Sequence, residues 1–485
     1  MPLETDLAAS APGNPPPNSP PDAGPGSGYG LRQGVLGSWD CVAQSISTMA
    51  PTASAAMTVP LVFASAGRGT WLAYLLATFC ILIMGLCIAR FARDSASPGS
   101  LYTYTAGSLP PILRSVAAWA LLVAYIGSGA SVVGGFIHYA NVVSGEFFGF
   151  GTPPVILSLL CVAAPVWVAC RDVKVSARSM LYIEMVSVAM ISTVFALVLW
   201  RHGLQVDTAQ LTLKEVKPSG VRLGLVLTMF SFVGFESATT LGQEVRNPLK
   251  TIPRAIILSA VLSGLFFIVA SYTEVVGFPP SAGSLADSDS PLSVLAESVG
   301  VKPLGPFIDI CVMVTMLACT LACVTASARV LLLMAHHGLA PEALCRIHPR
   351  NHTPHAAIIA TGLVTLLLSA PFAVFKVSGE TIYDWMGSLS TYGFITVYAL
   401  VAVALPIYLR RRHGFALGPI VLATLAVAAM ALVLAGTLYP VPDFPKNYLP
   451  YLFLLYLVVK AGWNAWARRR PGSRRDPGEA APASA

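Results

Sequence analysis

Long runs of apolar residues dominate the chain and limit what it can fold into. Each run extends over about 18 to 25 residues, the length at which a helix crosses a hydrocarbon layer about 30 Å thick. Hydrophobic residues make up 55% of the sequence and charged residues 11%, whereas a soluble domain carries about 25% charged residues. Only helices and closed barrels span lipid, and these runs lack the alternation of barrel strands. The sequence therefore predicts an all-α polytopic membrane protein.

Hydropathy and the positions of Gly and Pro predict about twelve transmembrane helices. The predicted spans are 36–64, 71–91, 112–143, 153–170, 179–200, 221–241, 254–277, 304–335, 355–375, 382–407, 415–437 and 448–467. Residues 1–34 are rich in Pro, Gly, Ser and Asn and show no apolar signal-peptide core, so we expect a disordered cytoplasmic tail. Residues 468–485 begin with a basic cluster and predict a second disordered tail.

Lysine and arginine are unevenly divided between the two sides that these spans imply. With a cytoplasmic N-terminus, 20 of them fall on the cytoplasmic side and 8 on the other, leaving out Arg329 and Lys460 within spans. Cytoplasmic loops carry the excess of basic residues in membrane proteins. We therefore expect an inner-membrane protein with both termini cytoplasmic. The basic residues are spread over many loops, so the net charge of +7 does not indicate nucleic-acid binding.

The first predicted span contains a proline among small and hydroxylated residues. Pro51 lacks a backbone donor and clashes with the preceding turn, so we expect the helix to open there. The small residues around it allow close approach and leave backbone groups facing a cavity. The candidate substrate-binding residues in this span are Ser47, Ala50, Pro51, Thr52, Ala53, Ser54 and Ala55.

The sixth predicted span contains a glycine followed closely by an acid. Gly234 permits unwinding, and Glu236 lies near mid-membrane, where a charge costs about 2.5–3.5 kcal/mol. Glu236 should therefore face water, a partner or a ligand. The candidate substrate-binding residues in this span are Phe230, Val233, Gly234 and Phe235.

Two interrupted helices at corresponding positions indicate a transporter built from inverted repeats. The predicted repeats cover 35–200 and 201–407, and residues 408–467 add two helices. Amides at the broken ends suit a carboxylate, and carbonyls suit an ammonium group or a cation. The alternative is that Pro51 and Gly234 are kinks that serve packing alone.

At these residues the chain resembles the amino acid–polyamine–organocation permeases. The most specific stretch is Phe230 to Ala238, FSFVGFESA, followed by EVRNP at 244–248 and IPRAI at 252–256. Supporting stretches are PGSLYTY at 98–104 and HGLAP at 337–341. The resemblance covers roughly residues 35 to 465. It implies a LeuT-type fold of five plus five helices, alternating access, and a substrate held by the two unwound segments.

The resemblance also implies roles for single residues. Ser54 falls where the family has the serine of a Gly-Ser-Gly motif, although alanines flank it here. Phe230 takes the place of an aromatic that covers the substrate in the similar arginine/agmatine exchangers, and Glu236 matches their glutamate that senses protonation. The tryptophan of their eighth helix corresponds to Cys323, which argues against a guanidinium-stacking site.

Coupling to an ion is left open by the same comparison. The lysine that replaces a sodium ion in some proton-coupled members corresponds to Ser187, and Glu184 lies one turn earlier. We take Glu236 and Glu184 as the candidates for proton coupling, with a sodium ion as the alternative. Tyr102 is a candidate inner gate or an interfacial anchor, and Arg329 is expected to snorkel or to pair with an acid.

The sequence therefore predicts a secondary active transporter that imports an amino acid or a related amine, probing two rival hypotheses. One is obligate exchange of amino acids, amines or polyamines, and the other is a nutrient sensor that transports nothing. No nucleotide loop, nucleophile elbow or zinc motif is found, so we expect neither enzyme activity, nor a cofactor, nor a metal site. The expected partners are the substrate, a coupling proton or sodium ion, and the lipid bilayer.

Overall fold

A computed structural model of the chain describes residues 29–468, apart from residues 172, 204, 206, 214, 215, 414–416, 440, 442 and 443. Residues 1–28 of the predicted N-terminal tail and residues 469–485 of the predicted C-terminal tail lie outside the described residues. The described part forms helices and no strand, with one isolated parallel bridge between Leu36 and Val245.

The long helices follow the predicted spans closely. Within the described residues, nine helical stretches are long and apolar enough to cross a membrane. They contain every predicted span except 221–241 and 448–467, which correspond to α10 and α17. α10 is only 14 residues long, because its span is interrupted. The number of twelve spans therefore stays a prediction.

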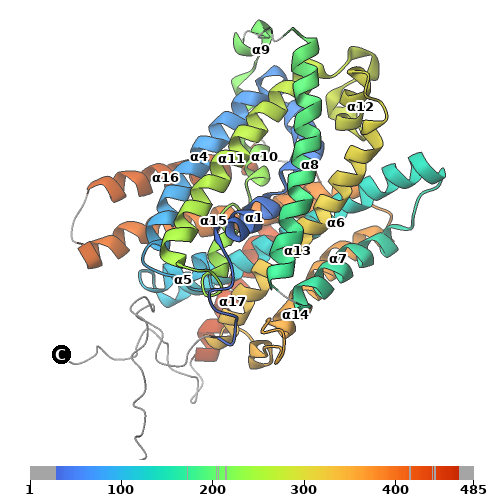
Figure 1. The fold of residues 1–485 in the computed structure, drawn as a ribbon. Coiled ribbons are helices and arrows are strands. Elements are labelled where there is room, and N and C mark those ends of the chain that lie inside the picture. The colour runs from blue at the N-terminus through green and yellow to red at the C-terminus, as the bar shows by residue number, and fades with distance from the viewer. Residues whose placement is uncertain are drawn as a thin grey trace, which may run out of the picture.

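The elements follow one another without sheet structure (Figure 1). The first half contains α1 (Ser38–Met49), α2 (Pro51–Ala53), a π-helical turn (Ser54–Thr58), α3 (Val59–Ala66), α4 (Thr70–Ala92), α5 (Leu101–Ala106), α6 (Pro111–Phe148), α7 (Pro154–Arg171) and α8 (Val173–Arg201). The second half contains α9 (Thr208–Leu211), α10 (Pro218–Ser231), a 3-10 turn (Ser237–Leu241), α11 (Pro248–Gly277), α12 (Pro291–Ser298), α13 (Leu304–His336), α14 (His355–Val374), α15 (Gly379–His413), α16 (Leu417–Leu438) and α17 (Leu449–Arg468).

α6 lies in the interior and packs against α15 and α13. Its contact with α15 passes through facing glycines. A Cβ on Gly134 would lie 2.6 Å from the Gly379 carbonyl oxygen, and one on Gly379 would lie 2.4 Å from the Gly134 carbonyl oxygen. Small residues let membrane helices approach until dispersion contacts between their backbones hold them together. We call this contact the α6–α15 glycine seam.

The ends of the helices define two faces. We call the face at which α1 begins the α1 face, and the other the opposite face. On the α1 face the Leu36 amide donates to the Glu244 carbonyl and the Arg246 amide to the Leu36 carbonyl, both at 2.9 Å. Residues 29–34, predicted as tail, also lie there, with the Tyr29 ring 5.0 Å from that of His336. Figure 1 shows α9 and α12 at the other end of the long helices.

Candidate functional site

The first span is interrupted at Ala50. α1 ends at Met49, and Ala50 adopts a left-handed conformation with φ 46° and ψ 67°. Pro51 then starts α2, where its missing amide costs no hydrogen bond because the first amides of a helix are free. The predicted opening of this helix is confirmed, with the break one residue before the proline. A second irregularity follows, since Ser54–Thr58 forms a π-helical turn.

The sixth span is interrupted at Gly234. α10 ends at Ser231, and a run of turns leads to the 3-10 turn at Ser237–Leu241. Gly234 has φ +88°, a value that side chains disfavour, and a Cβ there would lie 2.2 Å from Thr48 Cγ2. The predicted unwinding at Gly234 is confirmed, and the glycine is required both by its conformation and by contact with α1.

Hydrogen bonds join the two interrupted helices. Thr48 Oγ1 lies 2.8 Å from Ser237 Oγ, and the Ala238 amide donates to Ser45 Oγ at 3.1 Å. Gln44 Nε2 donates to the Ala322 carbonyl of α13 at 3.0 Å. These bonds satisfy backbone groups that unwinding has freed, so the breaks form one connected polar region in the interior.

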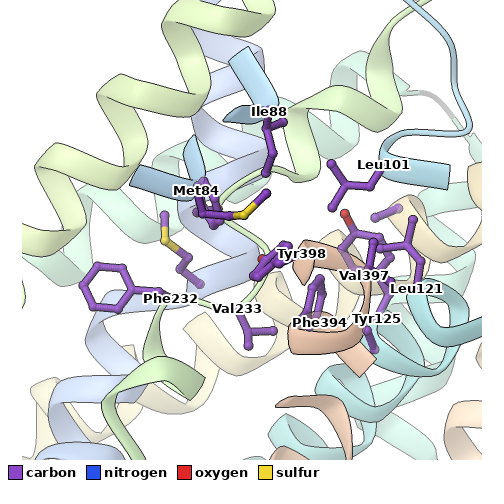
Figure 2. Packing of buried hydrophobic residues seen from close by; sticks show 14 of the residues in the cluster. Met84, Ile88, Leu101, Leu121, Tyr125, Phe232, Val233, Phe394, Val397 and Tyr398 are labelled. Carbon is purple, nitrogen blue, oxygen red and sulfur yellow. The ribbon is translucent and has the colours of Figure 1, made fainter. Parts of the chain in front are cut away.

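Glu236 lies fully buried beside the second break. Its two carboxylate oxygens accept hydrogen bonds from Tyr125 of α6 at 2.8 Å and from Tyr398 of α15 at 2.6 Å. Figure 2 shows Tyr398 beside Phe394 and Val233 within an apolar cluster. The predicted need for a partner at Glu236 is therefore met by two tyrosine hydroxyls. Sequence reasoning missed both tyrosines, which lie more than 100 residues away along the chain.

Glu184 lies buried on α8 against the first break. The backbone amide and the hydroxyl of Thr52 lie near its carboxylate, although neither oxygen makes a hydrogen bond of standard geometry within the described residues. Ser187, one turn later, accepts a hydrogen bond from Thr315 of α13 at 3.0 Å. The two candidates for proton coupling thus lie beside different breaks.

A cavity of about 530 Å³ opens between α3, α10, α15 and α16. Phe230 lines it and packs edge-to-face on Tyr383 at a centroid distance of 5.3 Å. Asp384 also lines it and is paired there with Lys446. Asp384 near a span end gave no sign of a binding role in the sequence, because the segment that supplies Lys446 follows 62 residues later.

Of the residues predicted to bind substrate, Phe230 lines this cavity. The other ten are buried at the two breaks, namely Ser47, Ala50, Pro51, Thr52, Ala53, Ser54, Ala55, Val233, Gly234 and Phe235. The Ser47 hydroxyl has no hydrogen-bond partner within the described residues, although it is fully buried. Buried polar atoms without a partner are uncommon, so this hydroxyl is available to a ligand.

Two contacts close the α1 face below the breaks. Arg329 of α13 forms a bidentate pair with Glu244, with Nε–Oε2 at 2.5 Å and Nη2–Oε1 at 2.9 Å, and both side chains are buried. The expected pairing of Arg329 with an acid is confirmed. Tyr102 of α5 is also buried and contacts His337 Nδ1 at 2.8 Å through its hydroxyl. It lies where an inner gate would lie.

Residues 36–459 match the family model described as amino acid permease. The chain belongs to this family. The permease is 24% identical to the branched-chain amino acid permease BcaP of Bacillus subtilis over 430 residues, which is 82% of each chain. It is 27% identical to the low-affinity putrescine importer PlaP of Escherichia coli over 61% of this chain and 66% of the relative. It is 22% identical to the methylthioribose transporter of Bacillus subtilis, over 78% and 81%.

A solved structure supports the fold of the permease. A Na⁺-coupled sialic acid symporter in a substrate-bound outward-open state matches with a TM-score of 0.53 and 14% identity, over 84% of this chain and 91% of that one. The permease is therefore a multi-pass membrane transporter of the LeuT-type fold and not an enzyme. The resemblance to amino acid–polyamine–organocation permeases is confirmed.

Proposed function

We propose that this permease imports an amino acid or a related amine across the cytoplasmic membrane by alternating access, driven by a proton that enters with it. The observation that carries the proposal is the placement of Glu236. It is a buried carboxylate next to Gly234, held between helices of both halves by Tyr125 and Tyr398. A carboxylate in the membrane interior is costly and marks ion or substrate pathways.

The driving force of one proton is sufficient for useful accumulation. At a membrane potential of about 100 mV, one charge supplies about 2.3 kcal/mol. Since 1.4 kcal/mol corresponds to one decade, this sustains a gradient of about 40-fold. Protonation of Glu236 removes the charge that the tyrosine hydroxyls stabilise, which changes the balance between two arrangements of these helices.

The proposal is tested with Glu236→Gln in proteoliposomes under an imposed inward pH gradient. Glutamine keeps the size of the side chain but carries no titratable group. We expect wild-type protein to accumulate substrate and the variant to lose at least 10-fold of that accumulation while it still exchanges substrate. Glu297→Gln, at an exposed acid paired with Lys302, should behave as wild type. Unchanged gradient-driven accumulation in Glu236→Gln would exclude Glu236 as the switch.

A second candidate is import of an amine that has no carboxylate. Glu184 already presents a carboxylate to the Thr52 amide at the start of α2, the place where a substrate carboxylate would bind. The cavity also contains Asp384. A thermal-shift screen against amino acids, polyamines and ethanolamine separates the candidates, because a diamine would stabilise the protein and leucine would not. Counterflow without an ion gradient would indicate obligate exchange instead of import.

A further inference from the structure

Three side chains that can bind a metal meet on the opposite face. His138 lies near the end of α6, Asp289 lies in the loop before α12, and Glu380 lies in the first turn of α15. Each offers one ligand atom, and these atoms lie within 4.8 Å of one another. His138 Nε2 is 3.7 Å from Glu380 Oε1. We infer that these residues form a binding site for a divalent transition-metal cation of the zinc type.

The α6–α15 glycine seam places two of the ligands. Gly134 lies one helical turn before His138, and Gly379 directly precedes Glu380. A Cβ on Gly379 would lie 2.7 Å from the His138 backbone nitrogen, so no side chain separates the helices at this point. The seam therefore fixes the backbone positions of His138 and Glu380 relative to each other. A site whose ligands are already positioned loses less entropy when it binds.

The third ligand is placed by the loop between α11 and α12. Buried side chains of Leu285 and Leu292 anchor this loop on either side of Asp289. His138 Nε2 donates to the Asp289 backbone carbonyl at 2.7 Å. A cation that replaces the proton on Nε2 would lie between the imidazole and this loop, with the carboxylates of Asp289 and Glu380 to complete its ligands.

The ligand set selects the class of cation. An imidazole with two carboxylates suits zinc and its neighbours, whereas calcium and magnesium prefer oxygen ligands alone. Bond lengths of about 2.0–2.2 Å place ligand atoms closer together than in the empty site, so the exposed Glu380 side chain must move inward. Its side chain is 51% exposed and that of His138 13%, so a cation reaches the site from the aqueous side.

Sequence spacing could not reveal this site. The three ligands come from three segments separated by more than 90 residues, so no local zinc motif exists. The expectation of no metal site rested on the absence of such a motif.

Zinc titration of the purified full-length permease tests the inference by calorimetry and by thermal unfolding in detergent. We expect one zinc ion per chain with micromolar affinity and a rise in melting temperature. His138→Ala should weaken binding at least 10-fold, and Glu380→Gln should weaken it by a smaller factor. His202→Ala, at an exposed histidine at the end of α8, is the matched control and should bind zinc as wild type does.

Several outcomes would overturn the inference. Equal zinc binding by wild type and His138→Ala would show an adventitious ion only. Competition by millimolar calcium or magnesium at equal strength would contradict the selectivity. Folding of the variants is checked by the melting temperature without zinc, because Glu380→Gln retains the shape of the side chain even if His138→Ala is destabilised. Neither measurement depends on transport, so the inference is tested apart from the proposed function.

Discussion

At the scale of single residues, the two breaks are built in different ways. Ala50 takes the left-handed conformation with a side chain, which costs about 1–2 kcal/mol. Gly234 takes φ +88° without that cost, and it also leaves space for Thr48. The first break is therefore held by its surroundings, and the second by its own residue type.

Gly234→Ala should destabilise the permease. The new methyl group would lie 2.2 Å from Thr48 Cγ2 in a disfavoured backbone conformation, and such strain costs about 1–3 kcal/mol. We expect a lower melting temperature and loss of uptake. Thr48→Ser in the same chain removes the clashing methyl group and should recover part of the loss. Gly418→Ala has open space around it and serves as the control; an equal effect at both glycines would contradict the contact with Thr48.

The sequence predicted Gly234, Glu236 and the opening near Pro51, because each is a residue type that a continuous apolar helix disfavours. It could not predict Tyr125 and Tyr398 as partners of Glu236, because tyrosines are common in apolar spans and the pairing depends on how α6 and α15 pack. The π-helical turn at Ser54–Thr58 also leaves no sign in the sequence.

At the scale of elements, glycines decide how closely α6 and α15 approach. Gly134→Ala would place a methyl group 2.6 Å from backbone atoms of α15, which cannot rotate away. We expect a destabilisation of about 1–3 kcal/mol, measured as a lower melting temperature in detergent. Gly145→Ala in the same helix has no neighbour within 4 Å and should leave it unchanged. A seam that accepts alanine without loss would show that the helices can separate at low cost.

The pair of Arg329 and Glu244 joins α13 to the segment before α11. Arg329→Ala leaves a buried carboxylate without its partner, and breaking such a pair costs about 3–5 kcal/mol. We expect a strongly reduced melting temperature and yield. Arg329→Met combined with Glu244→Gln removes both charges and should be less harmful than Arg329→Ala alone. Additive losses in the double variant would contradict a direct coupling of the two residues.

The helices themselves were predictable to within a few residues, as 304–335 for α13 shows. α6 extends five residues beyond its predicted end, to Phe148, because Gly149 with φ +72° and not Gly145 ends it. The predicted span 221–241 is helical only to Ser231 before its break.

At the scale of the whole molecule, the two faces differ in accessibility. The cavity lies between the outer parts of α3, α10 and α15, while the α1 face is closed by Arg329, Glu244 and the Leu36 bridge. With both termini cytoplasmic, as the basic residues predict, the cavity opens to the outside.

Thiol labelling of intact cells tests this orientation. Ser388→Cys lines the cavity and should react with a membrane-impermeant reagent from outside. Arg93→Cys, exposed beside the end of α4 on the α1 face, should react only in inverted vesicles. The parent protein controls for its own free cysteines. The reverse pattern would invert the predicted topology.

The Leu36 bridge has a consequence for the order in which the chain folds. Synthesis proceeds from the N-terminus, so Leu36 emerges about 200 residues before Glu244 and Arg246, its hydrogen-bond partners. α1 likewise packs on α8, α11 and α13, all of which are made later. The first span must therefore enter the bilayer with its break still unsupported. Its native shape is acquired only when the second half of the chain arrives, so maturation of this helix is a late event of biosynthesis.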